Sequence, residues 1–384
     1  MIQMGISISA KGERGGIPPP PAVLFTTTWT TTAPGQGIVL PYSALGTYSG
    51  TIDWGDATTS VNSFANKQHI YASPGTYTVE INGTCNGWNF NSYGGVNSSY
   101  ITSVVNWGQL QLGSDTGYYF NGCYNLELSS VSDVLDLTGI VNLGGMFNGT
   151  GISSVNNINS WNTSSVIDME NMFNSAMSFN QELTFDTSSV MDMNGMFGNA
   201  SSFNQPVSTF NTSNVVDMNY MFGNASSFNQ PVSNFDTSNV FYMSGMFVNA
   251  SSFNQSLSNF NTSNVTDMNT MFGMASSFNQ SLSNFDTSSV TDMSYMFYGA
   301  DAFNQNIGTW NVSNVTILDD FMGTKTPATF STTNLDAIYN GWSASGVQPN
   351  NHISFGTAKY TAASSVGRAR LISIDGWTIT DGGI

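Results

Sequence analysis

The stretch SFNQPVSTFNTSNVVDMNYMF, residues 202–222, decides the fold of this chain because it returns almost unchanged about every 25 residues. The methionine of its Met-Phe pair recurs as Met172, Met196, Met221, Met246, Met271 and Met296. The aromatic residue before its Asn-Thr-Ser triplet recurs as Trp161, Phe185, Phe210, Phe235, Phe260, Phe285 and Trp310. A repeat of this length can bury its apolar face only against its neighbours, so the copies are predicted to stack.

The apolar positions of the repeat predict its core. Residues equivalent to Val215, Met218, Phe222 and Phe228 are apolar in nearly every copy, so their side chains should form ladders inside the stack. The methionine row could suggest a soft-metal site, but no thiolate or imidazole ligand lies in register with it. Core packing is the better interpretation.

Short regular elements are expected within each repeat. The Met-x-x-Met-Phe spacing of residues 268–272 is helical, which predicts a helical turn over 267–275. Residues 265–268 and 255–257 are the expected strands.

Two polar rows follow the same register. An asparagine row should hydrogen-bond the backbone at each bend, and it consists of Asn180, Asn204, Asn229, Asn254, Asn279 and Asn304. An acidic row contains Asp168, Asp192 and Asp217, which are interpreted as solvated surface charges. A shared calcium ion is the alternative for these three carboxylates.

The charge balance argues against one class of partner. The 384 residues include 24 acidic and 7 basic side chains, and no Lys or Arg lies between Lys67 and Lys325. This span would repel a phosphate backbone, so we expect no nucleic-acid partner. Asn, Ser, Thr and Gly fill most polar positions, which favours a virion surface or an extracellular or cell-surface location. Residues 1–16 lack the features of a signal peptide, and no run is long enough to span a membrane.

Residues 22–87 have a different pattern. Short β-branched and aromatic runs at 23–26, 37–40, 50–54 and 76–81 predict a small β-sandwich. Cys85 and Cys123 are too few for a disulfide framework and are expected to be free, buried thiols, with pairing as the alternative.

Two motifs in this region carry a family resemblance. The sequence IDWGD at 52–56, followed by HIYASPGTYTV at 69–79, resembles the signature of the polycystic-kidney-disease-type (PKD) immunoglobulin-like domain. The resemblance implies a spacer or adhesion module. His69 with Asp53 and Asp56 could suggest catalysis or metal binding, but no nucleophile accompanies them and the motif already explains them.

The repeats carry a second resemblance. The recurring Val-Thr-Asp-Met, Met-Phe and Ala-Ser-Ser-Phe-Asn-Gln elements resemble the BspA-type leucine-rich repeats, and among them the bacterial surface repeats of about 25 residues. Members of that family are mostly cell-surface and secreted proteins, some of them adhesins. The resemblance therefore implies a mainly β, leucine-rich-repeat-like solenoid of about nine rungs with short helical turns, used for surface display and binding.

The chain is expected to have four regions. They are a Gly/Pro-rich arm at 1–21, the β-sandwich at 22–87, the solenoid with its N-terminal capping rungs at 88–324, and an α/β cap at 325–384. The arm is either an attachment segment or an unstructured tail. In the cap, 335–342 and 361–372 have helical spacing and 377–380 is strand-like.

No nucleophile–base–acid set, phosphate loop or zinc spacing occurs, so we expect a non-enzymatic protein without a cofactor. The first functional choice is an adhesion or recognition protein of a virion, such as a phage fibre, spike or capsid-decoration protein. It would bind a host-surface protein or glycan through the solenoid and attach through the arm. The alternative is a bacterial cell-surface protein whose repeats act mainly as a spacer. Either could be a homo-oligomer.

Ligand-contacting residues are expected where the copies disagree on an exposed repeat face. The candidates are Tyr220, Phe241, Tyr242, Tyr295 and Tyr298. Aromatic faces at these positions could stack on sugar rings. The alternative is that they are solvated residues or packing variants.

Overall fold

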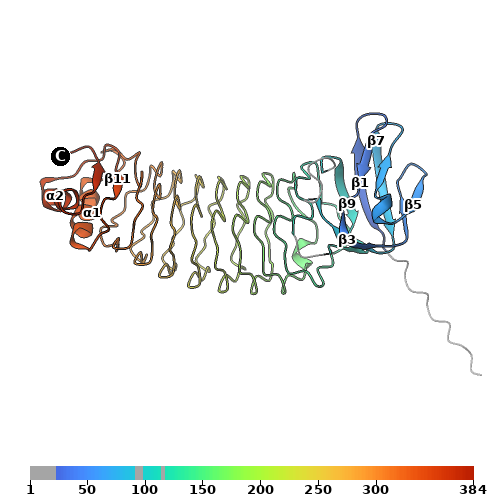
Figure 1. Ribbon diagram of the computed structural model, residues 1–384, viewed down its shortest axis with the longest axis horizontal. Helices are drawn as coiled ribbons and strands as arrows, with labels where there is room; N and C mark the ends of the chain where they lie inside the picture. Colours follow the sequence, from blue (N-terminus) through green and yellow to red (C-terminus); the bar gives the residue numbers. More distant parts are fainter. Residues whose placement is uncertain (1–22, 91–97, 114–116) are drawn as a thin grey trace, which may run out of the picture.

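The computed structural model describes residues 23–90, 98–113 and 117–384. The expected N-terminal arm lies outside these residues. Figure 1 shows strands at one end of an elongated molecule, a long array of stacked coils in the middle and two helices at the other end. The strands form open sheets and helices are few, so the chain is mainly β in a broad sense.

Short strands make up the N-terminal region. They are β1 (Phe25–Thr31), β2 (Gly37–Val39), β3 (Tyr42–Tyr48), β4 (Thr51–Asp53), β5 (Thr59–Val61), β6 (Gln68–Ile70), β7 (Gly75–Asn82), β8 (Cys85–Trp88), β9 (Ile101–Asn106) and β10 (Leu110–Gln111), with the 3-10 helix η1 (Phe64–Asn66) between β5 and β6. Their sheets have the orders β5-β4-β7-β1-β9, β10-β8-β3 and β2-β6. The Phe25 and Trp88 rings meet edge to face at 4.9 Å, which joins β1 to β8 through the core.

Strand β9 connects this region directly to the array. It pairs antiparallel with β1, and its Ser103 forms a parallel bridge with Glu127 in the first coil. The sheet therefore continues past the boundary expected at residue 87. Burial along β9 does not alternate, so its sequence lacks the period-2 signal of a half-exposed strand.

The coils of the array stack in parallel register. An unbroken series of single-residue bridges runs from Asn142 through each coil in turn to Ile317. Backbone amides of one coil donate to carbonyls of the next, as Phe197 N–H does to Met221 O at 2.9 Å. The Phe197 ring stacks on Phe222 of the next coil at 5.7 Å and 5°. The methionines that precede these phenylalanines are all buried, which confirms core packing for Met172, Met196, Met221, Met246, Met271 and Met296.

The prediction of a helical turn over 267–275 is wrong. These residues form consecutive hydrogen-bonded turns, because Thr270 and Met274 have φ angles of 52° and 59°, and left-handed residues interrupt a right-handed helix. The strand expected at 265–268 is reduced to one bridging residue, Asp267, and 255–257 forms none. In the described part of the array, the regular helix is η3 (Ile158–Ser160), outside the Met-Phe turns.

The asparagine row forms the expected ladder. The Asn229 Oδ1 atom accepts hydrogen bonds from the Asn254 backbone N–H at 2.9 Å and from Gln255 Nε2 at 2.9 Å. Asn204 makes the same pair of bonds to Asn229 and Gln230 at 3.0 Å each. Each amide therefore satisfies a backbone donor of the coil that follows.

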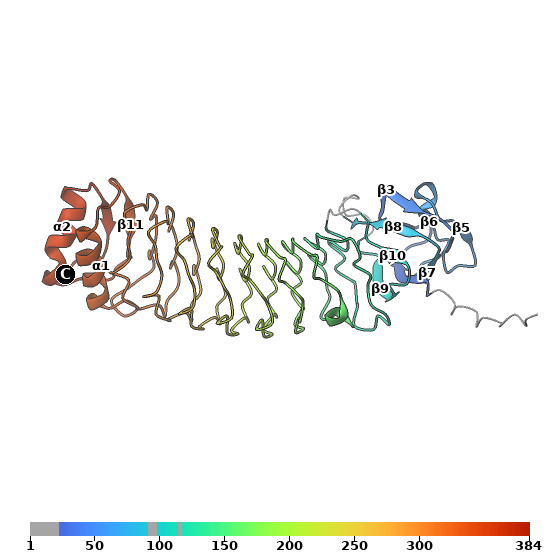
Figure 2. The same cartoon turned by 90° about the horizontal axis from the view of Figure 1, so that it is seen from below.

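The C-terminal cap contains α1 (Thr332–Ala344), β11 (His352–Ser354), η4 (Ala362–Ser364), α2 (Ser365–Ser373) and β12 (Thr378–Thr380). Strands β11 and β12 pair in parallel, and Figure 2 shows the helices closing this end of the array. Trp342 of α1 meets Phe321 of the last coil at 5.8 Å. Among the described residues, no helix is both long and apolar enough to cross a membrane.

Cationic side chains of the C-terminal cap make contacts within the cap and with the last coils of the array. Lys325 is buried, and its Nζ donates to the carbonyl oxygens of Ala300 and, at 3.2 Å, Asp301. Burial lowers the pKa of Lys325 to about 8. Arg368 pairs with Asp381 at 2.6 Å. These contacts are those of a structural cap.

Both cysteines are buried and free, as expected. Burial raises the pKa of Cys85 to about 12 and that of Cys123 well above its usual value. Neither thiol is therefore a reactive thiolate at neutral pH.

The ladder predicts the effect of removing one amide. Asn229→Ala leaves the exposed Asn254 N–H without its protein acceptor, so we expect local stability to fall by about 0.5–1.5 kcal/mol and hydrogen exchange at the Asn254 amide to accelerate. Asn229→Asp keeps the acceptor and should change the exchange much less. Unchanged exchange in Asn229→Ala, followed by NMR, would show that the ladder is not stabilising.

Candidate functional site

The five aromatic residues expected to contact ligand lie in three coils, in the segments that run from the repeat valine to the residue after the Met-Phe pair. Their side chains are between 37% and 46% exposed. They form two pairs instead of one cluster: Phe241 and Tyr242 have ring centroids 6.5 Å apart, and Tyr295 and Tyr298 meet edge to face at 5.8 Å. Tyr220 belongs to the coil before the first pair. We refer to these five residues as the aromatic edge.

Tyr220 and Tyr295 occupy a backbone position that disfavours tyrosine. Their φ angles are 52° and 56°, in the left-handed region. The equivalent residues Gly195 and Gly245 both have φ of 58°, which glycine adopts without a steric cost. A side chain at this position costs roughly 1–2 kcal/mol. The two tyrosines are therefore present against the local backbone preference.

The coil that follows Tyr220 leaves room for its ring. A Cβ atom placed on Gly245 would lie 2.7 Å from the Tyr220 ring, so only glycine fits beneath it. The ring is thus held against the next coil while 44% of the residue stays exposed. Such a ring presents a flat apolar face in a fixed orientation.

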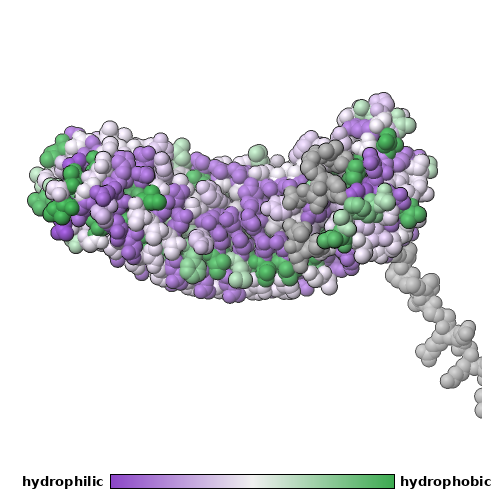
Figure 3. All heavy atoms as spheres, viewed as in Figure 1, coloured by the Kyte–Doolittle hydropathy of each residue, from purple (hydrophilic) through white to green (hydrophobic). Residues whose placement is uncertain are grey.

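An apolar stripe runs beside the aromatic edge and was missed by the sequence reasoning, apart from Phe241. It consists of Ile167, Met191, Val216 and Phe241, of which Val216 is half-buried and the other three are exposed. Each residue donates its backbone N–H to the carbonyl of the one before, as Met191 does to Ile167 and Phe241 to Val216. Figure 3 shows apolar side chains gathered along one long edge of the array. The available signal was the variable residue after the repeat valine, which is apolar in these copies and threonine in the later ones.

The acidic row lies next to this stripe. The Asp192 Oδ1 atom accepts a hydrogen bond from the Asn194 N–H at 2.8 Å. Burial, followed by the neighbouring negative charges of Asp217, Asp168 and Glu170, raises the pKa of Asp192 to about 6 despite that bond. Among the described residues, no group of three or more His, Cys, Asp or Glu side chains is placed to hold a metal ion. The calcium alternative for Asp168, Asp192 and Asp217 therefore gains no support.

The His69 cluster is part of the local scaffold. His69 Nε2 lies 2.8 Å from Asp56 Oδ2, and its ring stacks on Trp54 at 4.8 Å. Asp53 instead accepts from the Gly55 N–H at 2.9 Å. The carboxylates thus hold turns and a stacked ring, which favours the structural interpretation.

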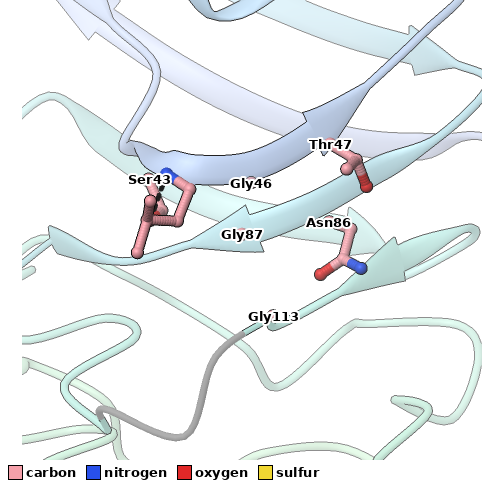
Figure 4. Close-up of a pocket in the computed structure, with 7 residues that line it drawn as sticks. Ser43, Gly46, Thr47, Asn86, Gly87 and Gly113 are labelled. Atoms are coloured by element: carbon pink, nitrogen blue, oxygen red, sulfur yellow. Dashed lines mark hydrogen bonds between the residues drawn. The ribbon is translucent and has the colours of Figure 1, made fainter.

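A small pocket lies between β3 and β8. Figure 4 shows Ser43, Gly46 and Thr47 on one side and Asn86, Gly87 and Gly113 on the other, and Leu45 completes the lining. Its volume is about 190 Å³. None of these seven residues is ionisable, and three are glycines, so the pocket offers little side-chain chemistry.

The raised pKa of Asp192 predicts a pH dependence. A carboxyl whose pKa is higher in the folded state makes the fold less stable as pH rises from about 4 to about 6. Asp192→Asn keeps the acceptor for Asn194, as Asn142 does for Gly144. We expect this variant to be more stable at pH 7 by about 1 kcal/mol, allowing for solvent screening, and to lose part of the pH dependence in urea unfolding.

Asp236→Asn is the matched control, because Asp236 is exposed and accepts from its own turn through the Ser238 N–H at 3.0 Å. Its unfolding free energy at pH 7 should not rise. An equal gain in both variants would show that the position in the acidic row is irrelevant.

The backbone strain predicts a contrast between two tyrosines. Tyr220→Gly removes a side chain from a left-handed residue, so the relief of about 1–2 kcal/mol should offset the lost ring contacts. Tyr298→Gly removes a similar ring where φ is not left-handed, so the unfolding free energy should fall by about 1 kcal/mol. Thermal unfolding of both variants measures the contrast, and equal losses would contradict it.

Comparison with known proteins links the array to one family. Neither the curated proteins nor the solved structures contain a significant match. The family described as "Mycoplasma protein of unknown function, DUF285" matches residues 141–240 and 227–337. Together the matches span 141–337, which covers the stacked coils, the start of the cap and just over half of the 384 residues. The chain therefore belongs to the DUF285 family of repeat-containing proteins.

Proposed function

We propose that this protein is a non-enzymatic adhesion or recognition protein displayed on a surface, and that its aromatic edge contacts the ligand. The observation that carries the proposal is that Tyr220 and Tyr295 are exposed at a left-handed position, which the two coils beside Tyr220 fill with glycine and the two beside Tyr295 fill with Thr270 and Asp320. The fold does not require a tyrosine there, since Gly195 and Gly245 support the same turn. Strained and exposed side chains of this kind are characteristic of functional surfaces.

The chemistry of the edge suits a ligand with both apolar and hydroxyl-rich parts. Phe241 belongs to the aromatic edge and also ends the apolar stripe, so the two features meet at this residue. Tyrosine supplies an apolar ring with a polar tip, a combination enriched at binding surfaces. A host-surface protein or a glycan would fit this description.

Two finer assignments belong to the proposal. The array is a leucine-rich-repeat-like solenoid related to the BspA-type repeats, supported by its period of about 25 residues and the parallel bridges between coils. The N-terminal strands form a PKD-like spacer, supported by the burial of Trp54 and by the hydrogen bond from Tyr71 OH to the Trp54 carbonyl at 2.8 Å.

Display on a virion, as a phage fibre, spike or decoration protein, is the first candidate role. Display on a bacterial cell as a spacer or adhesin is the second, and the family description favours it because it names bacterial proteins. The neighbouring genes separate the two roles. Virion structural genes would support the first, whereas genes of the cell envelope would exclude it.

A multiple variant tests the aromatic edge with residues that this chain already uses at equivalent positions. The changes are Tyr220→Gly, Phe241→Thr, Tyr242→Asn, Tyr295→Gly and Tyr298→Gly, which copy Gly195, Thr266, Asn142, Gly245 and Gly273. We expect the purified wild-type protein to bind intact bacterial cells or immobilised glycans. The variant should remain folded and lose at least about tenfold in affinity, equivalent to about 1.4 kcal/mol.

Met177→Ser is the matched control, because Met177 is an exposed array residue outside the aromatic edge and serine occupies the equivalent positions. Its binding should equal that of the wild type. Binding by the multiple variant at wild-type affinity, or no binding of the wild type to any cell or glycan, would refute the proposed role of the edge.

A further inference from the structure

We propose that a second pocket, where the N-terminal sheet meets the first coil, binds one ring of a neutral saccharide. We call it the junction pocket, and it is lined by Thr30, Thr32, Ser99, Tyr100, Thr102, Tyr124 and Asn125. The site is separate from the aromatic edge and does not depend on its function.

The junction pocket has the size of a small-ligand site. Its volume is about 300 Å³, at the lower end of the range for protein ligand pockets. Residue Thr30 comes from β1, Thr102 comes from β9, and Tyr124 with Asn125 come from the first coil. The pocket is therefore formed only where the sheet continues into the array.

Hydrogen bonds between these segments hold the walls of the pocket in place. Asn125 Nδ2 donates to the Ser99 carbonyl at 2.8 Å, which ties the coil to the segment before β9. The Thr30 N–H donates to the Tyr100 carbonyl at 2.7 Å, and the Glu127 N–H donates to the Thr102 carbonyl at 2.9 Å. A pocket fixed in this way needs little ordering when a ligand binds.

Four side chains of the lining keep polar groups available to a ligand. Neither the Tyr100 nor the Tyr124 hydroxyl has a hydrogen-bond partner among the described residues, and Asn125 uses only its amide nitrogen. The Thr102 hydroxyl donates to the Thr28 carbonyl at 3.2 Å and can still accept. These groups offer both donors and acceptors to the hydroxyls of a ligand.

The remaining features select a neutral sugar. None of the seven lining residues is charged, so the lining has no partner for an ionic ligand. Tyr124 is 60% exposed, so its ring is open to a flat apolar surface. A pyranose presents such a surface on its C–H face and hydroxyls around its rim, which complements a tyrosine ring surrounded by side-chain hydroxyls and an amide.

The test uses the full chain with methyl glucopyranoside, methyl mannopyranoside, methyl galactopyranoside and N-acetylglucosamine as probes. We expect saturation transfer in NMR from the protein to the ring protons of at least one of them at millimolar concentration. Tyr124→Ala should weaken the affinity about tenfold in calorimetric titration, because the ring contact is lost. Tyr100→Phe removes one hydroxyl with little change of shape and should also weaken binding.

Met177→Ser is the control, because Met177 is exposed and lies outside both the junction pocket and the aromatic edge, so the change should leave sugar binding unchanged. Tyr124→Ala should leave binding through the aromatic edge intact, so failure of either proposal can be told from failure of the other. The junction site is refuted if none of the four sugars shows saturation transfer, or if a sugar binds Tyr124→Ala as well as it binds the wild type.

Discussion

The hydrogen bonds between successive coils are the constraint on which the rest of the structure depends. A buried backbone group must find a partner, and in this array the partner lies one repeat away in the chain, as for Phe197 N–H and Met221 O. Side chains also form hydrogen bonds to the next coil. The buried Thr237 hydroxyl donates to the Asn261 carbonyl at 2.9 Å, and the Asn229 side chain accepts from the Asn254 N–H. An insertion in one coil would break several such ladders at once, which explains why the copies are nearly identical in length.

The same constraint leaves unsatisfied groups at the two ends of the stack, and the chain covers each end differently. At the start, β9 belongs both to the sheet of β1 and to the first coil, so the sheet itself is the cover. At the end, Lys325 stands where earlier coils have alanine, such as Ala300, and its ammonium group reaches back to that carbonyl. Helix α1 then covers the last aromatic residue of the core through Trp342.

Much of the array could be predicted from the sequence because the residues that form its core and its ladders recur at the same position in each repeat. Buried methionines such as Met221 and the asparagine ladder through Asn229 follow directly from register. The turns around Thr270 could not be predicted, because threonine rarely adopts a left-handed φ and its presence gives no sign that the backbone is left-handed there. The junction pocket could not be predicted from the sequence either. Strand β9 lacks an alternating pattern, and it pairs with β1, which lies some 75 residues earlier in the chain. The exposure of Ile167 and Met191 had no decisive signal in the sequence, because an aliphatic residue next to the buried repeat valine is equally compatible with the core.

The acidic row and the apolar stripe are best understood together. Each carboxylate of the row follows a stripe residue in the chain: Asp168 follows Ile167, and Asp192 follows Met191. The charge is not needed for the turn, because Asn142 makes the same bond, and it raises the free energy of the folded state at neutral pH. A row of negative charges beside exposed apolar side chains opposes the association of one array with another. At Tyr242 the row is interrupted, and Phe241 lies beside a tyrosine instead of a carboxylate. The coil of Phe241 thus adds no carboxylate to the row, and the nearest charges of the row are those of Asp217 and Asp267, which bridge Tyr242 from the two neighbouring coils.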